Sequence, residues 1–285
     1  MLIGILIDFL ITFLICLIIL LCIRPWNRPS FKTVLKVVGL GALSIIVTLI
    51  LGDLFKLLYL YIYGLFGVFI KESIFVNIIE NTFIIFAFAA LEEIAKYFLF
   101  NYLWNNGDIQ MKSPLQTTLV FVIVGATFSF IEDVKYIVEG ASAWARIITI
   151  ISGHLCYALL FSLFFTKEVV RSRCSYMMED NLVKLKRNPK YYNKYIIDKK
   201  YLLKGLLIST TFHFIHNFLI ELTSITFIFS YLLYALIIVL TLFFIIKIII
   251  MFKKDYSYNM LAERQISIDY PDIEKELESI NNVVK

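Results

Sequence analysis

Charged residues are scarce in this sequence: Asp, Glu, Lys and Arg make up 17% of its 285 residues. Soluble domains carry roughly 25% charged residues, so this composition excludes an ordinary soluble protein. Hydrophobic residues account for 60% of the chain, and the mean hydropathy is +0.82. Such a composition indicates that much of the surface faces a lipid bilayer.

Proline and paired cysteines are also rare. All five prolines lie outside the long apolar stretches. The four cysteines show no CxxC or other paired spacing, which excludes a disulfide framework. The first apolar stretch, from Met1 to Ile23, lacks a basic start and a small-residue cleavage site. We therefore expect it to be a retained span rather than a signal peptide.

The apolar stretches are continuous, and several exceed the roughly 20 residues that a helix needs to cross the hydrocarbon core. A transmembrane barrel would show short alternating segments instead. The sequence therefore predicts an all-α fold, a polytopic transmembrane helical bundle of about seven spans. The predicted spans are residues 2–23, 37–60, 74–102, 115–138, 146–166, 203–222 and 225–251. Because Asp53 and Lys56 interrupt the second apolar stretch, a kinked span with an interfacial piece, and a count of eight, are the alternatives.

The distribution of positive charge favours seven spans. A bundle over residues 1–251 with its N-terminus outside leaves four segments in the cytoplasm: 24–36, 103–114, 167–202 and 252–285. The loop 167–202 alone carries ten Lys and Arg residues, whereas the outside keeps only Lys71 and Arg146. An eighth crossing would export this loop, against the positive-inside rule. We expect a multi-pass protein of the cell membrane with a cytoplasmic C-terminus.

The basic loop and the tail have further patterns. The loop interleaves lysines with four tyrosines, Tyr191, Tyr192, Tyr195 and Tyr201. We interpret it as an amphipathic segment lying on anionic lipid rather than as a nucleic-acid site. In the tail, Pro271 and Asp272 precede apolar residues at helical spacing, which predicts a short cytoplasmic helix.

Four polar motifs interrupt the predicted spans. They are LEEIAKYF with Glu92, Glu93 and Lys96; GATFSFIEDVKY with Glu132 and Asp133; ISGHLCY with His154; and TTFHFIHNF with His213, His216 and Asn217. All three histidines of the chain lie within them. A charge at a helix centre costs about 2.5–3.5 kcal/mol on insertion scales, so the four carboxylates together would cost on the order of 10 kcal/mol. We expect these groups to face one another in a polar pocket.

The spacing within the motifs indicates acid–base chemistry. Lys96 lies at i+4 from Glu92 and at i+3 from Glu93, so it can pair with either carboxylate. Two neighbouring acids repel, so we expect their pKa values to split, which leaves one ionised and lets the other exchange a proton near neutral pH, as a general base requires. His213 and Asn217 share a helical face and can present an imidazole and a carboxamide to one oxyanion. His216 is a ligand, a relay or a packing residue.

Isolated acids elsewhere carry less information. We interpret Asp53 and Glu80 as hydrogen-bonded packing groups and Asp8 as incidental. Asp133 is equally compatible with packing and with function.

Metal dependence is left open by these motifs. The absence of HExxH excludes a zincin site. His154, His213, His216 and Glu132 are nevertheless candidate ligands for a divalent metal such as zinc, with an open position for water. Glutamate catalysis without a metal is the alternative.

Two non-hydrolytic functions compete with hydrolysis. A proton- or ion-coupled transporter also needs carboxylates and histidines at mid-membrane. However, the predicted spans contain no proline that would break a helix, as transporters favour. A non-catalytic immunity or scaffold protein is the other alternative.

The ordered motifs resemble those of the PrsW family of intramembrane proteases, which is grouped with the CAAX prenyl endopeptidases and bacteriocin-processing membrane proteins. The resemblance covers about residues 74–222, which would form the catalytic core. Two features match the PrsW branch rather than the CAAX branch: Phe128 is followed by Glu132, and Lys96 takes the place of an Arg one residue later.

The resemblance implies a catalytic set. Glu92 or Glu93 would activate water, aided by Glu132 and His154, and His213 with Asn217 would stabilise the oxyanion. The substrate would be a membrane-anchored protein or peptide, for example an anti-sigma factor.

Overall fold

The computed structural model describes residues 2–22, 29–66, 74–105, 111–140, 151–184, 200–223, 226–254 and 256–269. The regular elements among them are helices, and these residues contain no strand, which confirms the all-α class. The helices are α1 (Leu2–Cys22), α2 (Phe31–Phe66), α3 (Ile74–Asn105), α4 (Pro114–Val138), the π-helix η3 (Ile151–Leu155), α6 (Cys156–Lys184), α7 (Lys200–Thr223), α8 (Ile228–Lys253) and α9 (Tyr258–Asp269).

Four described segments are long and apolar enough to cross a membrane: Phe31–Leu65, Pro114–Val138, Ile151–Met177 and Ile228–Lys253. The apolar part of α1, Leu2–Ile18, is shorter. α3 and α7 carry the charged and histidine motifs, which lower their hydropathy. The predicted count of about seven spans is therefore not confirmed.

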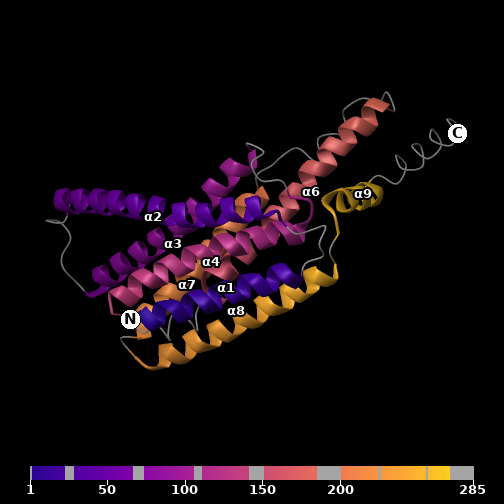
Figure 1. Cartoon of the computed structure of the whole chain (residues 1–285). Helices are drawn as coiled ribbons and strands as arrows, with labels where there is room; N and C mark the ends of the chain where they lie inside the picture. Colours follow the sequence, from indigo (N-terminus) through magenta and orange to yellow (C-terminus); the bar gives the residue numbers. More distant parts are fainter. Residues whose placement is uncertain are drawn as a thin grey trace.

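The helices lie alongside one another in a bundle (Figure 1), and they differ in how deeply they are buried. In α4 and in the η3–α6 segment, 78% of the apolar window is buried, against 28% in α2 and 22% in α8. The central helices are also joined by polar groups, because the Ser162 hydroxyl donates to Thr118 at 3.0 Å. α1 and α2 pack on α4, while α7 packs on α3, α6 and α8. The inner pair α4 and α6 therefore forms the frame for any buried site.

α2 runs without interruption through the two charges at which a kink was the alternative. The helix has 36 residues and a length of about 54 Å, well beyond a hydrocarbon core of about 30 Å. Asp53 and Lys56 are exposed on its surface, and Lys56 Nζ lies 5.5 Å from the centre of the Phe88 ring of α3. Glu80 on α3 accepts a hydrogen bond from the Tyr59 hydroxyl, which is the arrangement expected of a packing group.

One end of the bundle gathers the segments that the charge pattern assigns to one side of the membrane. A buried cluster there joins Val37 of α2, Phe100 of α3, Met111 before α4, Val169 of α6 and Tyr258 of α9. The predicted cytoplasmic segments thus meet at the same end of the bundle.

Two features at this end differ from the sequence prediction. α6 continues to Lys184, beyond the predicted end of the span at 166, and projects past the other helices beside α9 (Figure 1). α9 was not predicted. Its Tyr258 N–H donates to the Lys112 carbonyl at 2.9 Å, and its hydroxyl lies 2.8 Å from that of Thr117. The predicted tail helix after Pro271, and Tyr191, Tyr192 and Tyr195 of the basic loop, lie outside the described residues.

Candidate active site

Glu93 and Lys96 form a buried ion pair on α3. The Lys96 ammonium donates to Glu93 Oε1 at 2.7 Å, and each side chain is almost wholly buried. The pair follows from the i,i+3 spacing, which places both residues on the inner face of the helix. Lys96 Nζ also lies 4.1 Å from the centre of the Phe128 ring on α4, a cation–π contact. Contacts within α3 and with α4 thus hold Glu93 and Lys96 in place, independently of α6 and α7.

Gly125 lets α4 approach the segment that carries His154. A Cβ atom at this position would lie 2.6 Å from the His154 carbonyl oxygen and 3.0 Å from the Ala158 Cβ. Only a residue without a side chain allows this separation. One turn further along α4, the Phe128 ring packs on the imidazole of His154, with ring centroids 4.8 Å apart. α4 therefore sets the depth at which the imidazole sits.

A break in the helical backbone orients His154. Gly153, inside the π-helix η3, has a non-helical ψ of −127°, and π-bulges of this kind are frequent at functional sites. His154 Nδ1 lies 2.8 Å from Lys96 Nζ, and Nε2 lies 2.7 Å from Glu132 Oε2. An ammonium group can only donate, so Nδ1 accepts and the Nε2–H donates to Glu132.

His213 of α7 faces two carboxylates at once. Its Nδ1 lies 3.0 Å from Glu93 Oε1, and its Nε2 lies 3.5 Å from Glu92 Oε2. Because Glu93 also binds Lys96, its ionised carboxylate accepts from the Nδ1–H, and the lone pair of Nε2 is directed toward Glu92. A carboxylate behind an imidazole is the usual support of a metal-binding histidine.

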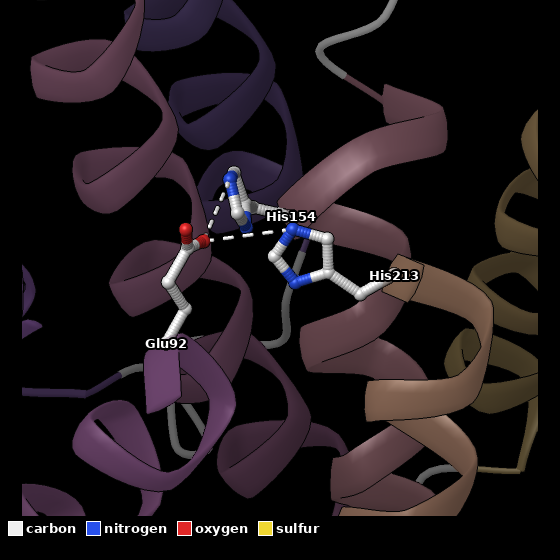
Figure 2. A group of neighbouring side chains, drawn as sticks. All are labelled: Glu92, His154 and His213. Carbon is white, nitrogen blue, oxygen red and sulfur yellow. Dashed lines mark ion pairs between the residues drawn. The ribbon is translucent and has the colours of Figure 1, made fainter. Parts of the chain in front are cut away.

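Glu92, His154 and His213 converge on one point (Figure 2). Glu92 Oε2 lies 3.5 Å from His213 Nε2 and 3.9 Å from His154 Nε2, and the three ligand atoms lie within 4.8 Å of one another. Ligands of a tetrahedral zinc ion with bonds of 2.0–2.1 Å stand about 3.4 Å apart. Glu92 Oε2 is buried and has no hydrogen-bond partner in the described part of the chain.

These observations fit a divalent metal at this point. A buried carboxylate oxygen beside an imidazole lone pair is a site that a cation would complete. The donor set of one carboxylate and two imidazoles is typical of catalytic zinc, which leaves a fourth position for water. His154 would bind the metal through Nε2, the atom that now lies 2.7 Å from Glu132 Oε2.

The group whose geometry could hold a metal overlaps only in part with the predicted candidates. In the described residues it contains Glu92, and it contains neither His216 nor Glu132. His216 is instead directed to Tyr157, whose hydroxyl lies 2.5 Å from His216 Nδ1. Glu132 stays at the edge of the site through its bond to His154.

Two predicted residues do not join the contacts at the centre of the site. Asn217 is half-buried one turn after His213, and it contributes none of the hydrogen bonds that link the described acids and histidines of the site. Asp133 is buried on α4 and accepts a hydrogen bond from Ser129 at 3.3 Å.

Tyr157 is the site residue that the sequence analysis missed. It follows His154 by three residues, so the helical spacing alone places its ring near that imidazole. Its ring stacks on His213 with centroids 4.8 Å apart.

The fold and the site together define a membrane-embedded helical protein whose buried carboxylates and imidazoles suit the activation of water. The family described as PrsW family intramembrane metalloprotease matches residues 29–246, more than half of the chain, and the chain belongs to this family. It is therefore an intramembrane protease, and its several long apolar helices make it a multi-pass membrane protein. The resemblance seen in the motifs is confirmed. No curated protein and no solved structure was found to match the chain.

Proposed function

We propose that this protein is a metal-dependent protease that cleaves a membrane-anchored protein or peptide at Glu92, His154 and His213. The convergence of Glu92 Oε2 and His213 Nε2, 3.5 Å apart and buried, is the observation that carries the proposal. These three residues would hold the metal, which when bound activates water and polarises the scissile carbonyl.

The other residues of the site have separate tasks in this proposal. Glu93 accepts from His213 Nδ1–H at 3.0 Å and from Lys96 at 2.7 Å, so it orients the imidazole and is not available as a base. Glu132 is the acid best placed for proton transfer, since its side chain is 17% exposed against 5% for Glu93.

In the proposed hydrolysis, Glu132 transfers a proton and Asn217 stabilises the oxyanion. As water adds to the carbonyl carbon, Glu132 takes one proton from it. The C–N bond then breaks, and Glu132 returns that proton to the departing amine nitrogen. Asn217, on the same helix as His213, would donate its amide hydrogens to the negative charge that develops on the carbonyl oxygen.

An apolar groove supports a substrate that lies in the membrane. It has a volume of about 370 Å³ and lies between α3 and α7, lined by Ile78, Ile79, Thr82, Phe83, Phe86 and Phe214. Thr82, Phe86 and Glu93 follow one another at helical spacing, so the groove and the site share one face of α3. On α7, Phe214 directly follows His213 and packs edge-to-face on Phe86 at 5.6 Å.

The apolar segment of a membrane-anchored substrate is the occupant that fits this groove. The groove is lined mainly by apolar side chains and lies on the face of α3 that also carries Glu93, so a chain lying in it would run along this face toward the site. An anti-sigma factor with a single span is one substrate of this class.

The charged segments support one orientation of the protein in the membrane. We propose an external N-terminus and a cytoplasmic C-terminus. Val37, Met111 and Val169, which pack in the same cluster as Tyr258, lie in or beside the predicted cytoplasmic segments. Those segments carry most of the Lys and Arg residues. The basic loop would contact anionic lipid there.

A metal and cleavage assay on the purified full chain tests the function. The probe is a fluorophore-labelled peptide with a single apolar segment, placed in vesicles of phosphatidylethanolamine and phosphatidylglycerol. We expect bound zinc, cleavage that 1,10-phenanthroline abolishes, and loss of both zinc and cleavage in Glu92→Gln. Glu80→Gln is the matched control, because Glu80 lies on the same helix and binds Tyr59 instead.

Three outcomes decide the matter. Cleavage that persists without metal and with the chelator, yet disappears in Glu92→Gln, would replace the metal with glutamate catalysis. Unchanged cleavage in Glu92→Gln would sink the assignment of the site. Equal losses in Glu80→Gln would show that the effect is structural.

A groove-filling variant tests the substrate class. Thr82→Trp should raise KM for the membrane probe and leave kcat nearly unchanged, because it blocks the groove without touching the site. Leu57→Trp on the exposed face of α2 should change neither constant. An unchanged KM in Thr82→Trp would exclude the groove as the binding surface.

A further inference from the structure

Tyr157 touches all three histidines of the chain. It is 1% exposed and lies one turn after His154. Its ring stacks on the imidazole of His213, with centroids 4.8 Å apart and planes inclined by 18°. Its ring lies edge-on to His154 at 5.8 Å and 84°, and its hydroxyl is 2.5 Å from His216 Nδ1.

The orientation of the His213 imidazole needs such a neighbour. Its Nδ1 must face Glu93 while its Nε2 faces Glu92, and a modest rotation about the Cβ–Cγ bond would break both alignments at once. That torsion is intrinsically soft in histidine. A parallel ring on one face, together with the perpendicular ring of His154 at 4.9 Å, confines it.

We propose that Tyr157, held by His216, is a positioning residue that fixes the plane of the His213 imidazole. The proposal rests on the proposed function, because it assigns both residues to the same hydrolytic site.

His216 supplies the second half of this arrangement. It is buried and follows His213 by three residues on α7, so the hydroxyl of Tyr157 ties α6 to α7 at the level of the site. The task of His216 is therefore to hold the Tyr157 ring in register with His213. Supports of this kind typically change metal affinity by 10–100-fold when they are removed.

Histidine-specific NMR on the full chain in detergent tests the proposal without any substrate. The chain contains three histidines, so ¹⁵N-labelled histidine gives three imidazoles, which single His→Gln replacements assign. Tyr157→Leu should shift the His213 and His216 signals and weaken zinc binding at least 10-fold. Tyr157→Phe keeps the stacked ring but loses its tie to His216, so it should shift the His216 signals most, shift those of His213 less, and lower the zinc affinity by only about 3-fold.

Phe165→Leu is the matched control. Phe165 is similarly buried on α6, but it packs in the cluster around Phe100 and Phe121. All three imidazoles and the zinc affinity should keep their wild-type values in this variant.

Two results would overturn the positioning role. One is a Tyr157→Leu protein with unchanged His213 signals and unchanged zinc affinity. The other, decisive if Tyr157→Leu does not fold, is a Tyr157→Phe protein in which the His216 signals do not move. If the wild type binds no zinc and cleaves no probe, the proposed function fails, while the His213 shift still decides the role of Tyr157.

Discussion

The Glu93–Lys96 pair allows stability and catalysis to be separated. Glu93→Gln keeps the shape of the side chain but leaves Lys96 as a buried cation without its carboxylate. Breaking a buried pair in this way costs about 3–5 kcal/mol, which corresponds to a fall in Tm on the order of 10 °C. Lys96→Met should cost a similar amount for the opposite charge.

The double variant distinguishes the two contributions. Replacing both members of a buried pair by neutral groups is often close to neutral for stability, so Glu93→Gln with Lys96→Met should recover most of the loss. Cleavage should stay 10–100-fold below wild type, because the His213 Nδ1–H then faces an uncharged oxygen.

The unfolding of each variant can be followed with a thiol-reactive dye that labels cysteines as they become exposed. Cys156 and Cys174 are fully buried, so they react only when the bundle opens. Glu80→Gln should cost only about 1 kcal/mol, the usual net value of one hydrogen bond. If the losses of the two single variants simply add in the double variant, the pair is not coupled and the reasoning is wrong.

Two further predictions concern packing and the last helix. Gly125→Ala should destabilise the protein by about 1–3 kcal/mol and reduce cleavage, because the new Cβ would lie 2.6 Å from the His154 carbonyl oxygen. Gly39→Ala is the control, because nothing lies within 4 Å of its added Cβ. It should stabilise α2 by about 0.5–1 kcal/mol in the same dye assay. Burial raises the pKa of Tyr258 above its ordinary value, so the folded state keeps the proton. The docking of α9 should therefore be stable below pH of about 10 and weaken as the pH rises above that value. Limited proteolysis between pH 8 and 11 should show this release in the wild type, and an equally steep pH dependence in Tyr258→Phe would contradict it.

The sequence predicted the parts of the site that depend on local spacing. Lys96 and Glu93 pair because they lie three residues apart on one helix. The presence of every histidine in an apolar stretch indicated a shared pocket, because solitary imidazoles and acids are costly in lipid. Glu92, His154 and His213 do meet, and the roles assigned to them stay predictions until tested.

The sequence could not predict which apolar face of a helix packs inward. In a membrane protein the lipid-facing side is as apolar as the core, so hydrophobic periodicity carries little information. The stacking of Tyr157 on His213 depends on how α6 and α7 are rotated, and the break at Gly153 has no signal in the hydrophobic pattern. For the same reason the sequence suggests an interruption at Asp53, whereas the structure has one continuous helix, α2, with Asp53 on its exposed side.

The last described helix, α9, belongs to the folded bundle although it follows the final apolar stretch. Tyr258, Ala262 and Ile266 are buried at helical spacing, and the carbonyl of Ala262 accepts a hydrogen bond from the Cys174 thiol at 3.6 Å. A shortened chain that stops at Lys254, after the final apolar stretch, would open these contacts and the wholly buried Thr117 hydroxyl to water. Truncations that remove α9 should therefore destabilise this end of the bundle.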